Sequence, residues 1–170
     1  MTDKSKNNFA EFKARLARLS DEDAIALLNE NIRDNTFPEN VSYLLFQKAV
    51  VLKFVDINEC IHTYQECIEK YPQEIGAFYF LAEIYAENGK FKEAIGIIGK
   101  SLLQEKSQAY LYYEKSLIAL RCYCYARLGN TKLAIADFET VPEDSFDHGW
   151  IELDPPLTKA SVMNMIKNIR

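Results

Sequence analysis

Apolar residues recur at helical spacing through residues 75–108, and the rest of the chain can be compared with this stretch. Phe78, Leu81 and Tyr85 are separated by steps of three and four, which places their side chains on one face of a helix. A second apolar run follows Gly89, and glycine tolerates the positive φ that closes a helix C-terminus. The stretch is therefore predicted to form two helices that meet at a tight turn.

The same pattern recurs on both sides of this stretch, as expected of an internal repeat. Residues 41–74 correspond to it in size and polarity at an offset of 34. Residues 109–142 correspond at an offset of 40, with identities that include Tyr85 with Tyr125, Gly89 with Gly129 and Ala94 with Ala134. Because residues 107–128 contain no glycine or proline, the first helix of this third copy is predicted to be about two turns longer.

A pair of helices is predicted before the repeats, in residues 7–35. Its first helix has an apolar face made of Phe9, Phe12, Leu16 and Leu19. Ser20 is followed by three acidic residues, which is a helix start with Asp23 at the place of a capping-box glutamate. The second helix is predicted to end near Asn35.

Polar residues also mark the start of the second helix in two of the repeats. Asp56 is predicted to cap the helix that follows it, and Asn130 or Thr131 is predicted to do the same in the third copy. Both positions come directly before a run with helical periodicity, so they support the proposed helix boundaries.

The composition changes after residue 142. Residues 143–157 are acidic, contain two prolines and a glycine, and have no helical period, so we expect a loop that carries Trp150. Residues 158–169 are predicted to form a last helix that begins at Thr158 and covers the final apolar face, with Trp150 as a further cover, a groove plug or an interface anchor.

The repeats resemble tetratricopeptide repeats (TPR), with departures at Gln47, Lys48 and Val55 in the first copy. The resemblance implies an all-α fold, a right-handed α-α superhelix that is a solenoid of antiparallel helix pairs. It also implies a single domain over residues 1–170 that binds other proteins and has no catalytic activity of its own.

In this family the first helix of each repeat lines a concave groove, and the resemblance carries that role to particular positions here. The groove is then mainly apolar and aromatic, so a partner carboxylate would lose water without gaining a charged contact. An apolar or amphipathic segment fits better, with Glu83 or Glu87 selecting a basic flank. An aromatic residue at such a position can equally belong to the core. The candidate partner-binding residues are Leu45, Ala49, Lys53, Tyr79, Glu83, Glu87, Tyr123 and Arg127.

Charge and hydropathy narrow the classes of partner. The net charge of −5 is spread along the chain without a basic stripe, which argues against nucleic-acid binding. No apolar run approaches the ~18 residues that a membrane span needs, and the first dozen residues lack the apolar core of a signal peptide. We therefore expect a cytoplasmic protein that does not insert in a membrane.

The four cysteines are predicted to be free thiols. Cys60 and Cys67 lie on one helix about 10 Å apart along its axis, beyond disulfide reach. Cys122 and Cys124 point to different sides of a helix. With only His62 and His148 to add, no zinc-type spacing occurs, and no metal or other cofactor is expected.

Sequence signatures of catalysis are scarce. The chain contains no G-x-S-x-G, phosphate-binding loop or G-x-G-x-x-G motif. His62 with Glu66 has ion-pair spacing but equally fits a solvated helix face, and Asp147-His148 has no nucleophile nearby in sequence. The chain is therefore not expected to be an enzyme.

The preferred hypothesis is a TPR adaptor or chaperone-like protein that holds a protein or peptide segment in its concave groove. Its plan is similar to that of bacterial secretion chaperones. One alternative is an immunity or inhibitor protein that blocks a toxin or enzyme, through its acidic loop at residues 143–154. Another is a self-assembling scaffold, with the groove filled by the chain's own tail or by a second copy in a homodimer.

Overall fold

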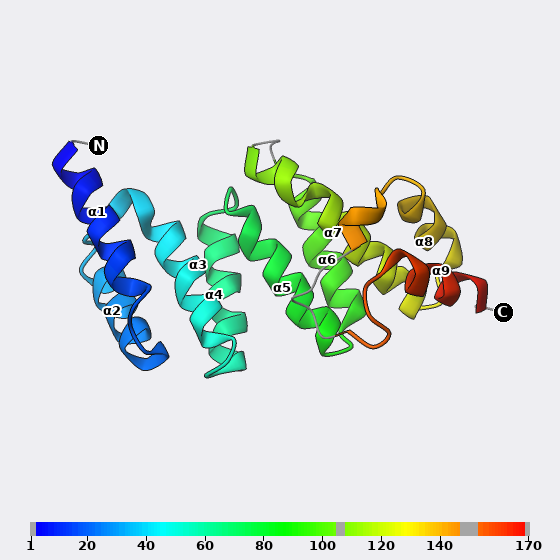
Figure 1. Cartoon of the computed structure of the whole chain (residues 1–170), viewed down its shortest axis with the longest axis horizontal. Coiled ribbons are helices and arrows are strands. Elements are labelled where there is room, and N and C mark those ends of the chain that lie inside the picture. The colour runs from blue at the N-terminus through cyan, green and yellow to red at the C-terminus, as the bar shows by residue number, and fades with distance from the viewer. Residues whose placement is uncertain (1–2, 105–107, 147–152, 169–170) are drawn as a thin grey trace. The chain divides into compact units, whose positions relative to one another are not determined.

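The computed structural model describes residues 3–104, 108–146 and 153–168, and over these ranges it contains α-helices, two 3₁₀ turns and no strand. The all-α prediction is therefore confirmed. Figure 1 labels the helices in chain order. Their bounds are α1 Asp3–Leu16, α2 Asp21–Arg33, η1 Pro38–Asn40, α3 Val41–Leu52, α4 Ile57–Lys70, α5 Ile75–Glu87, α6 Phe91–Leu102, α7 Gln108–Arg127, α8 Thr131–Phe138, η2 Glu143–Phe146 and α9 Lys159–Asn168.

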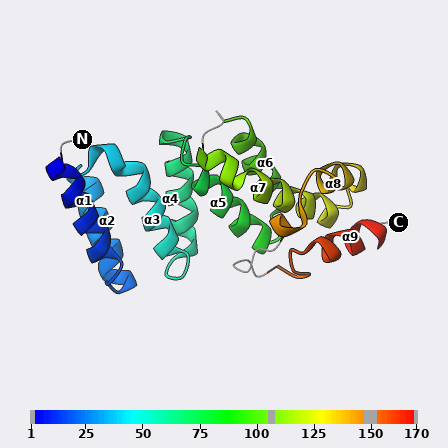
Figure 2. The same ribbon diagram turned by 45° about the horizontal axis from the view of Figure 1, so that its top comes forward.

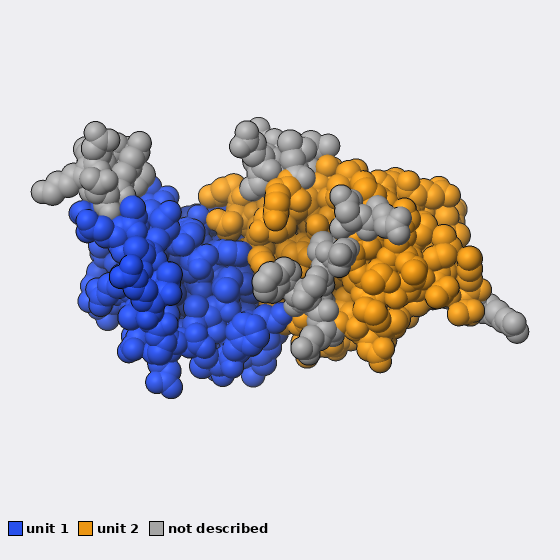
Figure 3. All heavy atoms as spheres, viewed as in Figure 1, with its two compact units in different colours: residues 1–71 blue, residues 72–170 orange. Residues whose placement is uncertain are grey.

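The chain divides into two compact units, which Figure 3 shows in different colours. Unit 1 is residues 1–71 and contains α1 to α4, whereas unit 2 is residues 72–170 and contains α5 to α9. The boundary falls between Tyr71 and Pro72, close to the end of the first predicted repeat. A single domain was expected from the sequence, and the two units are described one at a time below.

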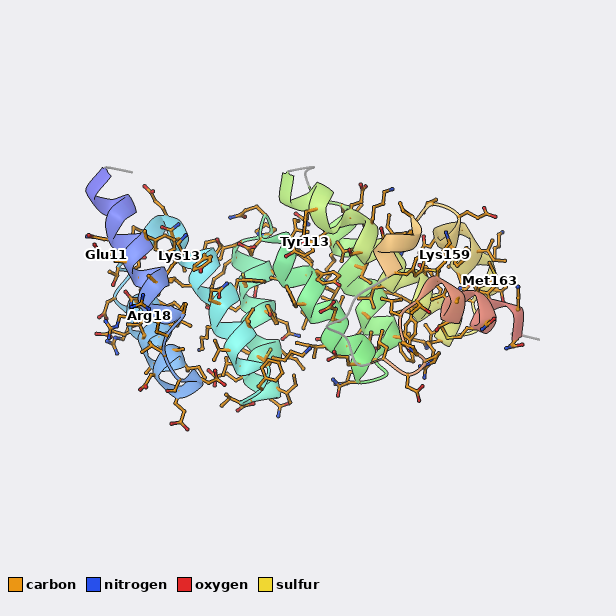
Figure 4. All side chains as sticks on the ribbon, in the orientation of Figure 1. Glu11, Lys13, Arg18, Tyr113, Lys159 and Met163 are labelled. Atoms are coloured by element: carbon orange, nitrogen blue, oxygen red, sulfur yellow. The ribbon has the colours of Figure 1, made fainter. Side chains whose placement is uncertain are left out.

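Unit 1 is built from successive helices joined by short turns. Its core contains the buried side chains of Phe12 on α1, Leu27 and Leu28 on α2, and Leu44 on α3. Lys13, labelled in Figure 4, lies with its ammonium group over the ring of Phe9, 5.4 Å from the centroid. The predicted helix pair before the repeats thus packs against the first helix of the first repeat.

Side-chain caps start two helices of unit 1 where the sequence predicted them. The Ser20 hydroxyl accepts a hydrogen bond from the backbone N–H of Asp23 and donates one to the Asp23 carboxylate at 2.8 Å. Asp23 therefore bonds the capping hydroxyl, and not a backbone N–H as a capping-box glutamate does. Asp56 accepts from the N–H groups of Asn58 and Glu59, both at 3.0 Å.

Unit 2 contains two helix hairpins, α5 with α6 and α7 with α8, and its turns have the predicted form. Gly89 and Gly129 lie at the two hairpin turns with φ of 71° and 74°. Helix α7 has 20 residues against 13 for α5, so the extra two turns predicted for the third repeat are present. Asn130 caps α8 by accepting from the N–H of Leu133.

Helix α9 covers α7 and α8, as Figure 2 shows from a second angle. Val162 and Ile166 are its buried residues, and the Thr158 hydroxyl accepts from the N–H of Ser161 at 3.1 Å, as predicted for the helix start. The segment before α9 differs in part from the predicted loop. Residues 143–146 form a 3₁₀ turn that buries Phe146 against the ring of Phe138, because an aromatic side chain there can complete the core. Trp150 lies outside the described residues.

Candidate functional site

One face of α7 contacts a non-helical segment of the chain itself. Tyr123 and Arg127 are four residues apart, so their side chains lie on the same side of the helix. The Arg127 guanidinium donates to the Tyr123 hydroxyl at 2.7 Å and to the backbone carbonyl of Asp154. The Tyr123 hydroxyl donates to the same carbonyl at 3.3 Å. Two side chains of α7 thus converge on one peptide carbonyl.

Aromatic rings fix the direction of the Arg127 guanidinium. It lies 4.9 Å from the centroid of Phe91 on α6 and 5.7 Å from that of Tyr123. Arginine stacks on ring faces and keeps its charge under all ordinary conditions. Burial raises the pKa of the Tyr123 phenol above its usual value although Arg127 acts to lower it, so the phenol remains a donor at neutral pH.

Residues 153–157 combine buried apolar side chains with one main-chain carbonyl, that of Asp154, which α7 binds. Leu153 and Leu157 are buried in the core of unit 2, whereas Asp154 between them is exposed. Pro155 and Pro156 have no N–H, so the carbonyls are the main-chain groups these prolines offer for hydrogen bonding. We call residues 153–157 the bound segment.

An open cleft of about 530 Å³ lies beside the bound segment. Ala126 and Arg127 of α7 form one side and Pro155 another. Helix α9 contributes its remaining lining, Ser161, Asn164, Met165 and Asn168. The lining mixes a cation, amides and apolar surface, which suits a polypeptide better than a purely apolar ligand.

A second group of aromatic side chains lies between α5 and the first half of α7. Tyr79 and Tyr113 have ring centroids 5.2 Å apart, Tyr79 and Phe80 5.4 Å, and Tyr112 and Tyr113 4.9 Å. Tyr113 is labelled on α7 in Figure 4. We call Tyr79, Phe80, Tyr112 and Tyr113 the aromatic cluster.

Two acidic residues, Glu83 on α5 and Glu74 directly before it, act on the aromatic cluster. Glu83 is 2% exposed, and Tyr79, one helical turn before it, is 6% exposed. Burial, followed by the charge and hydrogen bond of Glu83, raises the pKa of the Tyr79 phenol. Burial also raises the pKa of Tyr113, with added contributions from Tyr112 and from the charges of Glu74 and Glu83.

The structure places the eight predicted binding residues in different environments. Leu45 and Ala49 of α3 are buried, and Lys53 is half-buried at the end of that helix. In unit 2, Tyr79, Glu83 and Tyr123 are buried, Glu87 is half-buried and Arg127 is exposed. The structure brings Tyr123 together with Arg127, and Tyr79 together with Glu83. Their role in binding a partner remains a prediction.

Two participants in these groups were absent from the sequence prediction. Phe91 reaches Arg127 from a different helix, and no sequence spacing indicates that contact. Asp154 contributes a main-chain carbonyl, which any residue has. Tyr112 and Tyr113 did have a signal, because the added portion of the third repeat is conspicuously aromatic.

The cysteines are placed as inert packing residues. All four are free and buried, and the Cys60 and Cys122 thiols donate to the carbonyls of Ala49 and Ala134, each at 3.1 Å. Burial raises the pKa of Cys60, Cys122 and Cys124 to about 12. Such thiols are poor nucleophiles and metal ligands at neutral pH.

The histidine motifs give no assembled catalytic site in the described part of the chain. His62 is exposed, and the carboxylate of Glu66, four residues on, pairs with the Lys70 ammonium at 2.8 Å. Asp147 and His148 lie outside the described residues. Within the described ranges, no three His, Cys, Asp or Glu side chains are grouped closely enough to hold a metal ion, and no helix is both long and apolar enough to cross a membrane.

A scan against protein-family models found no match, and searches of curated proteins and of solved structures also found none.

Proposed function

We propose that this protein is a TPR-like adaptor or chaperone-like module that holds an apolar or amphipathic segment of a partner protein. In this proposal the helix pairs stack into a right-handed superhelix, as the sequence resemblance implies. The observation that carries the proposal is the bound segment on α7. A face that the resemblance assigned to partner binding, through Tyr123 and Arg127, contacts a non-helical segment of the same chain in this structure.

The contacts explain why such a face accepts a segment of another protein. Arg127 and Tyr123 bind a backbone carbonyl, which every polypeptide offers, while the buried positions of Leu153 and Leu157 select apolar side chains. The cleft of about 530 Å³ beside Pro155 gives a longer segment further room. The partner class is therefore a non-helical segment with apolar residues about four positions apart.

The proposal is tested with the chain's own sequence as the probe. A capped, fluorescent peptide of residues 151–158, IELDPPLT, is added to the full chain carrying Leu153→Ala and Leu157→Ala, which weaken the internal segment. We expect saturable binding with a Kd on the order of 10–100 μM, typical of a short segment that makes few contacts. Fluorescence anisotropy measures the affinity.

The matched variants show whether α7 is responsible. Adding Arg127→Ala should weaken binding at least about tenfold, because a hydrogen bond from a charged donor contributes about 1.5–3 kcal/mol. Lys100→Ala removes a cation from the last turn of α6 and should leave the affinity unchanged. Equal binding with and without Arg127, in variants that unfold at the same temperature, contradicts the proposal.

The bound segment also favours a second candidate, in which it permanently closes this face and the protein acts as a scaffold. The same experiment separates the two functions. A scaffold of this kind leaves the peptide unbound even when the internal leucines are truncated.

A further inference from the structure

The contacts that hold the bound segment use one nitrogen of the Arg127 guanidinium. Its Nη1 group donates both to the Tyr123 hydroxyl and to the Asp154 carbonyl. A guanidinium has five N–H groups, so those on Nε and Nη2, which share another edge, remain for a further acceptor. Among the described residues, no other group hydrogen-bonds Arg127, and no carboxylate, that of Asp154 included, forms an ion pair with it.

The same helix shows what such an edge binds. Arg121 donates from its Nε and Nη2 groups to the two carboxylate oxygens of Asp137, at 2.8 and 2.7 Å. The fork of two N–H groups matches the spacing of carboxylate oxygens, which makes these paired bonds stronger than single ones. Arg127 has the same donors on the corresponding edge, six residues further along α7.

The cleft beside the bound segment adds uncharged polar groups to this cation. Arg127 lines the cleft of about 530 Å³, and the other residues of that lining carry no charge. Asn164 and Asn168 are one helical turn apart on α9, and each carboxamide has two N–H donors for a carboxylate oxygen. One cation in an otherwise neutral lining complements one negative charge. The cleft is therefore electrostatically suited to a single anionic group.

We propose that Arg127 and the α9 side of this cleft form a subsite for one acidic side chain, aspartate or glutamate, of the partner segment. The inference rests on the proposed function for the polypeptide nature of the ligand. The carboxylate accepts from Nε and Nη2, while Nη1 keeps its bonds to Tyr123 and to a main-chain carbonyl. At this one position the proposal replaces the sequence-based expectation that a partner carboxylate would gain no charged contact.

The experiment uses the ¹⁵N-labelled native chain, with residues 153–157 in place, and two probes of equal size. N-acetylglutamate α-amide carries one negative charge, whereas N-acetylglutamine amide is neutral. The acidic probe should shift the Nε–H resonance of Arg127 and backbone amides of α9, with a Kd on the order of 10 mM for so few contacts. The neutral probe should leave these resonances in place, and added salt should weaken the acidic probe.

Variants assign the acidic probe to this cleft. Arg127→Gln should abolish the shifts of α9, and Arg127→Lys, which keeps the charge without the fork of donors, should still weaken binding about threefold. Asn164→Asp adds a negative charge to the lining and should weaken the acidic probe about fivefold. Lys167→Gln is the matched control, because it changes the net charge equally at an exposed residue of α9 outside the lining, and its effect should stay below about twofold.

Three results overturn the subsite in variants that unfold at the same temperature as the parent. They are equal shifts with the two probes, an acidic-probe affinity that Arg127→Gln leaves unchanged, and equal weakening by Asn164→Asp and Lys167→Gln. The peptide experiment for the proposed function requires a probe to take the place of residues 153–157, and this experiment does not. Failure of one is therefore distinct from failure of the other.

Discussion

Gly89 and Gly129 show how a single residue type fixes the hairpins of unit 2. Both have positive φ, 71° and 74°, and a Cβ added at either position would meet nothing within 4 Å. Backbone conformation is therefore the reason for glycine at these turns, and space is not.

Replacing either turn glycine with alanine should destabilise the protein by about 1 kcal/mol, the cost of placing a side chain in the left-handed region. Urea unfolding measures the change. Gly96→Ala is the matched control, because Gly96 lies inside α6 with ordinary φ and equal space. That variant should be more stable than the parent by ~0.5–1 kcal/mol, and a loss of stability there would contradict the explanation.

Burial makes a prediction about the cysteines. Because the pKa of Cys60, Cys122 and Cys124 is raised to about 12, their thiols should resist a thiol-specific colour reagent at pH 8 in the folded protein. All four cysteines should react once urea unfolds the chain. Rapid labelling of Cys60, Cys122 and Cys124 in the native protein would contradict this prediction, because it would mean that the buried surroundings of these thiols open easily to solvent.

The same raised pKa values predict that the folded protein loses stability at alkaline pH. A thiol whose pKa rises from 9.0 to about 12 on folding contributes stability that is complete below pH 9. That contribution is lost as the pH rises toward 12, since the unfolded chain releases the proton first. The midpoint of urea unfolding should therefore decrease steadily between pH 9 and pH 12.

At the scale of elements, α7 and α8 are joined by a bidentate ion pair. Arg121 donates to the two carboxylate oxygens of Asp137 at 2.8 and 2.7 Å, and both side chains are largely shielded from solvent. Such pairs are stronger than single contacts because both N–H groups are aligned. The pair fixes α8 against α7 near Cys122, whose thiol bonds the same helix.

Asp137→Asn should destabilise the protein by roughly 1–3 kcal/mol, because it leaves a half-buried guanidinium without its counterion. Thermal unfolding followed by circular dichroism measures the loss. Asp34→Asn breaks the pair of Arg33 with Asp34 on the surface, where the side chains are 73% and 49% exposed, and should have no measurable effect. Equal losses in both variants would contradict the role given to burial.

The helices were largely predictable because local signals agree along the chain. Apolar periodicity, the caps at Ser20 and Asp56, and the glycines at the turns all act over a few residues. The extra length of α7 followed from the missing helix breakers. The 3₁₀ turn at residues 143–146 was missed because burial of Phe146, a tertiary effect, decides it.

The candidate site was predictable only in part. The resemblance assigned Tyr123 and Arg127 to the groove, as it did Tyr79 and Glu83, and the structure brings each pair together. The bound segment was not assigned to α7 from the sequence, because a contact through a main-chain carbonyl leaves no trace in residue type. The ring of Phe91 was missed for a related reason, since it joins the site across two helices.

At the scale of the whole molecule, the account depends on α7 of unit 2. This helix contacts the other helices of that unit, binds residues 153–157 through Tyr123 and Arg127, and contributes Tyr112 and Tyr113 to the aromatic cluster. A partner segment that replaces residues 153–157 would thus meet a carbonyl-binding pair, an apolar core and a cleft on one surface.

Photo-crosslinking tests this claim most directly. The peptide IELDPPLT, with a photoreactive benzoylphenylalanine in place of its last leucine, is irradiated with the full-length Leu153→Ala, Leu157→Ala variant, and mass spectrometry maps the attachment sites. The account predicts crosslinks on α7 and α9, lost when Arg127→Ala is added. Crosslinks concentrated on exposed apolar residues elsewhere, such as Phe54 and Leu103, or unaffected by Arg127→Ala, would contradict it.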